Sequence, residues 1–233
     1  MNKFSIVIPV YNEAKNLRIL IPRIYQVLKN EEFELIIVDD SSTDNTTKLL
    51  KKCKKKNFYY IIRKSNRDLS KSCVLGFKKS KYKNIIVMDG DLQHKPSDIK
   101  KFLYVFRIKN PDIVVGTRNL FKYKKHNLNA FRLFASRALI LIVNLLLENK
   151  TSDPMSGFFM FKKEIFLKSE KKLINKGYKI LLDLLYISNQ KIKVYDVSID
   201  FDSRSKGKSK MSMKILIYLI FMIVRKFISR ILF

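Results

Sequence analysis

Two carboxylates separated by one residue, Asp89 and Asp91, give the strongest chemical signal in the sequence. They follow the apolar run Ile85–Met88, which predicts a buried strand and places both at its carboxyl end. Paired hard oxygens suit Mg²⁺ or Mn²⁺ shared with substrate phosphates, and Gln93 offers a third oxygen. Turn carboxylates that cap the following helix are the alternative. The spacing alone therefore leaves a metal site and a helix cap open.

A second acidic pair, Asp39 and Asp40, follows the apolar run Phe33–Val38 and precedes the polar segment Ser41–Asp44. The polar segment has the chemistry of a helix cap, and the carboxylates equally suit ribose and base contacts. In a parallel sheet, ligands bind beyond the carboxyl ends of the strands. We therefore expect the two acidic pairs to converge on one sheet edge.

Strands and helices are predicted to alternate through residues 1–117. The strands are continuous apolar runs, which is typical of a mostly parallel sheet covered on both faces. Expected strands are Phe4–Val10, Phe33–Val38, Phe58–Ile62, Ile85–Met88 and Ile113–Val115. Expected helices cover Glu13–Leu28, the basic segment to about Lys56, Lys71–Lys79 and a segment opened by Pro96.

The second half of the chain is less regular, and neither a repeat nor a linker divides it. We expect one domain over residues 1–210, followed by an apolar and basic helix over 211–233. The elements expected before that helix are a long helix (Asn129–Leu147), a loop and strand (Asp153–Phe161), a helix (Tyr178–Asn189) and a strand (Lys193–Phe201).

The formal net charge of +28 comes from 48 Lys and Arg against 20 Asp and Glu. With 47% hydrophobic residues the chain is not a disordered basic tail. The charge leaves open nucleic acid, an anionic membrane, phosphorylated substrates, or an AT-rich codon bias toward Lys. Two Cys without a CxxC spacing and two His exclude a zinc framework and fit a reducing compartment.

Two apolar runs bear on membrane contact. Ala138–Leu147 and Ile215–Val224 are both shorter than the about 20 residues of a spanning helix. Met211–Phe233 instead predicts a basic helix that lies in the membrane interface or docks on a membrane partner; a buried core helix is the alternative. The N-terminus is not a signal peptide, because Pro9 interrupts its apolar run.

Glycine is scarce, with only six residues, and most of them stand beside polar candidates. Gly90 lies between the two carboxylates, Gly116 precedes Thr117, and Gly157 lies in Asp153–Phe158. Such positions suit sharp turns or close approach to a ligand. The loop Arg204–Lys210 places cations on flexible backbone, which suits a diphosphate or lipid phosphate; a disordered basic loop is the alternative.

Seven motifs in this order resemble glycosyltransferase family 2 and, within it, the dolichol- or polyprenol-phosphate mannose synthases. The resemblance runs from about residue 3 to 211. The first three motifs mark the broad family, and Gly116–Arg118, Ser156–Phe158 and Arg204–Lys210 mark the polyprenol-phosphate branch. The motifs are Ile8–Glu13, Val38–Asp44, Met88–Pro96, Gly116–Arg118, Asp153–Phe158, Gly177–Lys179 and Arg204–Lys210.

The resemblance implies an α/β GT-A fold for residues 1–210, with a mixed, mostly parallel sheet and helices on both faces. It implies an enzyme that moves a hexose from a nucleotide sugar to polyprenyl or dolichyl phosphate with Mg²⁺ or Mn²⁺ and inversion. Mannose from GDP-mannose is the first expectation, and a UDP-sugar donor is the alternative. The expected location is the cytoplasmic face of a membrane, peripheral or short-anchored, without nucleic acid and with a membrane partner protein left open.

The resemblance also assigns roles residue by residue. It places Asp89, Asp91 and Arg204 in catalysis, and Asp89, Asp91 and Gln93 on the metal. It assigns lipid-phosphate contacts to Arg118, Arg132 and Ser136. Donor contacts fall to Pro9, Tyr11, Glu13, Val38, Asp40, Met88, Asp89, Gly90, Arg118, Arg204 and Lys210.

Two features depart from the family pattern or remain open. Asp68–Lys71 stands where the family has a glycine-rich segment, which puts the shape of that loop in question. The acceptor phosphate, with a second pKa of about 6, is already an anion and needs no strong base. Asp183 is a candidate for orienting the acceptor; a surface carboxylate facing Lys179 is the alternative.

Overall fold

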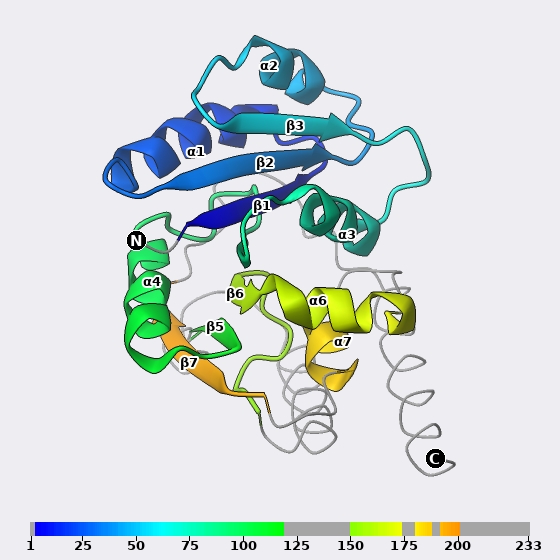
Figure 1. Cartoon of the computed structure of the whole chain (residues 1–233). Coiled ribbons are helices and arrows are strands. Elements are labelled where there is room, and N and C mark those ends of the chain that lie inside the picture. Colours follow the sequence, from blue (N-terminus) through cyan, green and yellow to red (C-terminus); the bar gives the residue numbers. More distant parts are fainter. Residues whose placement is uncertain (1–2, 119–149, 174–179, 188–191, 201–233) are drawn as a thin grey trace, which may run out of the picture.

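Seven strands form one mixed sheet in the computed structural model of the chain (Figure 1). The structure describes residues 3–118, 150–173, 180–187 and 192–200. The strands are β1 (Phe4–Val10), β2 (Phe33–Asp39), β3 (Phe58–Ile62), β4 (Asn84–Val87), β5 (Ile113–Arg118), β6 (Phe159–Lys162) and β7 (Val194–Ile199). Their order is β3-β2-β1-β4-β6-β5-β7, and only β6 pairs antiparallel with its neighbours. The predicted α/β class with a mixed, mostly parallel sheet is confirmed.

The helices lie on both faces of this sheet, as the continuous apolar strands predict. Strands β1 and β2 are buried at every position. The helices are α1 (Ala14–Val27), α2 (Thr46–Lys52), α3 (Leu69–Lys79), α4 (Asp98–Lys109), α6 (Lys163–Ser169) and α7 (Ile180–Ile187), with a 3₁₀ turn at Glu170–Lys172.

Helix ends differ from the prediction where the chain must turn back to the sheet. Helix α2 ends at Lys52 rather than about Lys56, because Cys53 is already extended and β3 begins at Phe58. Helix α4 begins at Asp98, two residues after Pro96, and a turn precedes it in which Asp98 N–H donates to the Lys95 carbonyl. Helix α6 was not predicted.

Two apolar cores occupy the two faces of the sheet. Alternate residues of β1 point to opposite faces, so Val7 joins one core and Ile6 joins the other. The first core packs α3, α6 and α7 against the sheet, with Phe77 at edge-to-face distances of 5.0 Å from Phe161 and 5.4 Å from Phe166. The second packs α1 and α4. The sheet is therefore held rigidly on both sides.

The direction of β6 decides which segments reach the carboxyl edge of the sheet. Parallel strands β2, β1 and β4 end there, so Asp39 and Asp89 flank the end of β1. Strand β6 runs the other way, and its first residue, Phe159, pairs with Val87 of β4 and Val115 of β5. The residues that precede β6 therefore arrive at the same edge as the acidic pairs.

Two predicted helices lie outside the described residues, namely the helix over Asn129–Leu147 and the C-terminal helix over 211–233. The division of the chain at residue 210 falls there too and stays a prediction. In the part of the chain that the structure describes, every helix is too short or too polar to cross a bilayer.

Candidate active site

Asp89 and Asp91 follow β4 at the carboxyl edge, as predicted. Asp91 is 6% exposed and its Oδ1 accepts a 3.2 Å hydrogen bond from the Gln93 N–H. The Asp89 side chain is 38% exposed. Ser97, rather than either carboxylate, occupies the N-cap position of α4. The pair instead stands at the edge where ligands of such sheets bind.

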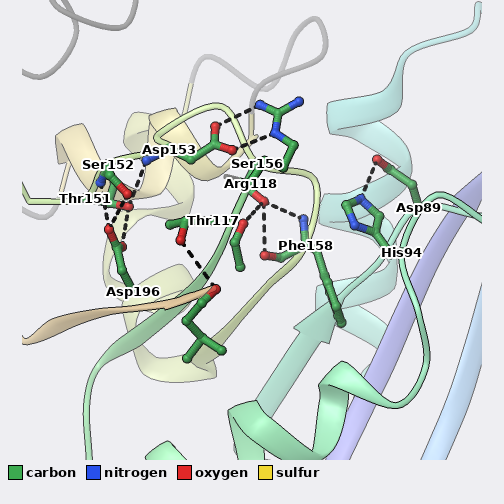
Figure 2. A network of polar contacts seen from close by, with 12 residues as sticks. Asp89, His94, Thr117, Arg118, Thr151, Ser152, Asp153, Ser156, Phe158 and Asp196 are labelled. Atoms are coloured by element: carbon green, nitrogen blue, oxygen red, sulfur yellow. Dashed lines mark hydrogen bonds and ion pairs between the residues drawn. The ribbon is translucent and has the colours of Figure 1, made fainter. Parts of the chain in front are cut away.

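The Asp89 carboxylate packs against Gly157, the residue two before β6. A Cβ built on Gly157 would overlap Asp89 Oδ2 and would lie only 2.9 Å from Asp89 Cγ. On another side the buried His94 places Nε2 3.4 Å from Asp89 Oδ2 (Figure 2). The His94 ring packs on Phe158, with centroids 5.0 Å apart. The Asp89 carboxylate is thus confined both by the nearby His94 and by Gly157, which is distant in sequence.

Side-chain hydrogen bonds fix the segment that carries Gly157, residues 151–158, at several points (Figure 2). Arg118 donates from Nε and Nη2 to the two oxygens of Asp153, at 2.7 and 2.9 Å. Ser156 Oγ donates to the Gly116 carbonyl at 2.7 Å. Asp196 of β7 accepts a 2.6 Å hydrogen bond from the Thr151 hydroxyl. The end of β5 and the middle of β7 therefore fix the segment that leads into β6.

Arg118, expected to bind phosphate, lies at the end of β5 beside this segment. Its side chain is 25% exposed and that of Asp153 is 2% exposed, so the ion pair is largely shielded from water. A bidentate pair of this kind fixes the guanidinium plane. Arg118 is consequently oriented before any ligand arrives.

The residues expected to line the nucleotide differ in how much side chain they expose. Pro9 and Val38 are buried within the sheet and Met88 is buried just after β4, so only the backbone of these three residues is open to a ligand contact. Tyr11 is half-buried, and the exposed Arg67 guanidinium lies over its ring at 4.2 Å from the centroid. This cation–π contact adds a positive group that sequence reasoning missed.

Asp40 is 6% exposed and its two oxygens hold the loop after β3. Its Oδ1 accepts from Arg63 Nη1, and its Oδ2 accepts from the Asp68 N–H at 2.8 Å. Arg63 also donates to Ser72 Oγ at 3.0 Å and to Ser65 Oγ at 2.8 Å. This network orders the segment that departs from the family pattern. Arg63 was also missed, although it follows β3 at the same sheet edge.

The loops after β1 and β2 are joined by hydrogen bonds. Asn12 Oδ1 accepts from the Thr43 N–H at 2.8 Å, and Asp44 Oδ2 accepts from the Ala14 N–H at 3.2 Å. Burial pushes the pKa of Asp44 upward, but hydrogen bonds from Thr46 and Ala14 outweigh it and hold that pKa below its ordinary value. The polar segment after β2 thus connects two loops.

Left-handed backbone occurs at three non-glycine residues beside the site. The φ angles are 57° at Asn12, 63° at Ser41 and 66° at Leu92. A bulky residue such as Leu92 rarely adopts this conformation, and such strain clusters at functional sites. The backbone geometry therefore supports the location that the carboxylates indicate.

The remaining site candidates either lie outside the described residues or lie in α7. Arg132, Ser136, Arg204 and Lys210 lie outside the described residues. Asp183 is 1% exposed in α7, so its interpretation as a surface carboxylate is wrong.

A groove of about 570 Å³ lies between α1 and α2, and its lining includes Leu17, Ile21 and Lys48. None of the predicted site residues lines it.

A family model, "Glycosyl transferase family 2", matches residues 5–169. A dolichol-phosphate mannosyltransferase from Pyrococcus furiosus is 34% identical over 216 residues, which cover 91% of this chain and 60% of that protein. This chain thus spans about three fifths of that relative. The enzyme of the same name from Mycosarcoma maydis is 31% identical over 224 residues, which cover 91% of this chain and 74% of the relative.

The fold has solved counterparts. Glucosyl-3-phosphoglycerate synthase from Mycobacterium tuberculosis matches with a TM-score of 0.73 over 98% of this chain and 80% of that chain. At 14% identity this likeness shows the fold alone. The family model, by contrast, covers most of the chain, including Asp89, Asp91 and Asp153–Phe158. The chain therefore belongs to glycosyl transferase family 2, with dolichol-phosphate mannosyltransferases among its relatives.

Proposed function

We propose that this chain transfers a hexose from a nucleotide sugar to a polyprenyl or dolichyl phosphate, with GDP-mannose as the first donor. The observation that carries the proposal is the acidic pair at the carboxyl edge, Asp89 and Asp91, with Asp89 confined by Gly157. The relatives named dolichol-phosphate mannosyltransferase support this pair of substrates. In this proposal residues 1–210 catalyse transfer and 211–233 bind the cytoplasmic face of a membrane.

The donor set fits a divalent ion shared with substrate. Among the described residues, no three His, Cys, Asp or Glu side chains are grouped as a metal site. Mg²⁺ characteristically takes one or two protein carboxylates and completes its shell with water and substrate phosphates. Asp89 and Asp91 match that requirement, with Gln93 as a further oxygen. The M. tuberculosis structural neighbour was solved with Mn²⁺ and UDP, which supports this choice of ion.

In the proposed reaction, positive groups neutralise the leaving diphosphate and the acceptor phosphate supplies the nucleophile. A bound divalent ion would neutralise charge on the departing nucleoside diphosphate. Arg118, whose guanidinium is held by Asp153, would bind phosphate oxygens, and the predicted contacts of Arg204 and Lys210 would add to it. The acceptor phosphate is itself the anionic nucleophile and needs no strong base. Its attack opposite the leaving group inverts the anomeric carbon.

A UDP-hexose donor is the second candidate. It is favoured by the M. tuberculosis structural neighbour, which was solved with Mn²⁺ and UDP-glucose. The acceptor and the roles of Asp89 and Asp91 would stay the same. Only the contacts to the base would differ.

The decisive experiment is a donor-by-acceptor transfer assay with radiolabelled GDP-mannose and UDP-glucose, polyprenyl phosphate, and Mg²⁺ or Mn²⁺. Asp91→Asn should abolish transfer. Asp112→Asn is the matched control, because Asp112 lies at the start of β5 on the opposite sheet edge, paired with Lys162 at 3.1 Å. The proposal would be refuted if the chain transferred sugar from neither donor, or if Asp91→Asn were as active as Asp112→Asn.

A further inference from the structure

We propose that Gly157 and His94 are positioning residues that hold the Asp89 carboxylate ready for the divalent ion. The inference rests on the proposed function, because it concerns the same ion. Neither residue is assigned to touch substrate. Their role is to restrict one ligand to a single orientation before the ion and the donor bind.

The first argument is steric. Glycine at position 157 leaves space that the Asp89 carboxylate fills, since an added Cβ would overlap Oδ2 and lie 3.0 Å from Oδ1. Real Cβ atoms essentially never approach other atoms so closely, so any side chain at this position must displace the carboxylate or the turn that carries it. An absent side chain is therefore what allows Asp89 its position.

The second argument is that the turn cannot readily move away. Ser156, next to Gly157, donates from Oγ to the Gly116 carbonyl at 2.7 Å, and Phe158 packs at 4.5 Å between centroids on Phe102 of α4. Arg118 and Asp153 clamp the start of the turn. Because the residues on both sides of Gly157 are fixed, a Cβ at position 157 would displace the Asp89 carboxylate rather than the turn.

The third argument concerns a second neighbour of the same carboxylate. His94 is 2% exposed, and its Nε2 lies 3.4 Å from Asp89 Oδ2 (Figure 2). Phe158 supports the His94 ring, so the same segment braces both neighbours of Asp89. Groups that orient a metal ligand commonly alter metal affinity by about 10–100-fold when they are replaced.

The test measures Mn²⁺ binding by calorimetry on the purified full chain with GDP present, so that no turnover is needed. Gly157→Ala is expected to weaken Mn²⁺ binding at least about tenfold. Gly76→Ala is the matched control. A Cβ there would also overlap its neighbour, Val7 Cγ1, but in the apolar core away from Asp89. It should lower the melting temperature without changing Mn²⁺ affinity.

A second pair of variants covers the case in which Gly157→Ala does not fold. His94→Gln keeps a nitrogen near Nε2 and should retain Mn²⁺ affinity, whereas His94→Phe fills the space without it and should weaken binding. Wild-type affinity in Gly157→Ala, or equal affinities in the two His94 variants, would overturn the inference alone. A wild-type chain that binds no Mn²⁺ with GDP or UDP would overturn the metal-dependent function as well.

Discussion

Arg63 and Asp40 form a buried ion pair between the ends of neighbouring strands, with side chains 7% and 9% exposed. The guanidinium also donates to the Ser65 and Ser72 hydroxyls, which fixes the loop between β3 and α3. That loop brings Arg67 over Tyr11. The pair thereby connects the sheet edge to the candidate nucleotide site.

Arg63→Met should destabilise the fold by about 3–5 kcal/mol, because it leaves the buried Asp40 charge without its partner. Urea unfolding at neutral pH measures the loss. Arg107→Met is the control, since its ion pair with Glu31 is half-exposed and should be worth less than about 1 kcal/mol. Equal losses in the two variants would contradict the structural role of the Arg63 pair.

Arg118→Lys should raise the KM for a phosphate-bearing substrate, because a single ammonium cannot reproduce the bidentate contact that orients the guanidinium. Steady-state transfer kinetics with varied donor and varied acceptor identify which phosphate is involved. Arg107→Lys changes a comparable pair with Glu31 outside the candidate site and serves as the control. If the two variants have the same KM values, Arg118 does not bind phosphate.

Acid should remove the stabilisation that Asp44 supplies. Its pKa is lower in the folded chain than its ordinary value of 3.8, so the folded state favours the carboxylate. The contribution is complete above about pH 5 and fades as the pH falls through 3.8 toward the folded pKa. Asp44→Asn should therefore lower unfolding stability at pH 7 and have a smaller effect at pH 3.

The control for this pH dependence is Asp200→Asn, whose carboxylate is 73% exposed and lies 3.7 Å from Lys95. It should change stability little at either pH. Unfolding in guanidinium chloride, a salt that screens surface charge, measures the free energy of unfolding of both variants at each pH. A deficit in Asp44→Asn that grows as the pH falls would show that the sign of the linkage is wrong.

The two thiols should react at different rates. Cys73 is fully buried, and burial together with the charges of Asp89, Asp68 and Asp40 raises its pKa. Cys53 is half-buried at the end of α2. Ellman's reagent should therefore label Cys53 in the native chain and both thiols in denaturant, with Cys53→Ser as the control. Rapid native labelling of Cys53→Ser would contradict the burial of Cys73.

Strand positions could be predicted because the strands are short continuous apolar runs. Phe4–Val10 and Phe58–Ile62 were predicted to the residue, since an apolar run of strand length bounded by polar residues has few other solutions. This holds for the fully buried β1 and also for β3, which is partly exposed. Helix ends depend on tertiary geometry. Nothing local in Lys51–Lys56 stops a helix, and α2 ends where the chain must return to β3.

The carboxylates of Asp89 and Asp91 were identifiable as a candidate metal site because their spacing is local in the sequence. Their supports were not identifiable in the same way, because each contact spans a long stretch of chain. Asp40 and Arg63 meet only when β2 pairs with β3, and Gly157 meets Asp89 only when β6 enters the sheet in reverse. Sequence suggested the importance of Gly157 through the scarcity of glycine, but not its contact.

The Arg118–Asp153 pair closes the base of the intervening chain, because β5 ends at one partner and the return to β6 begins at the other. A bidentate guanidinium–carboxylate pair that is largely shielded from water holds its two partners in one relative orientation. The pair therefore joins the end of β5 to the segment that leads into β6 through side chains, in addition to the ladder pairing of the two strands. Strand register and the position of Gly157 beside Asp89 thus share one anchor, so a change in either partner of the pair would be transmitted to both.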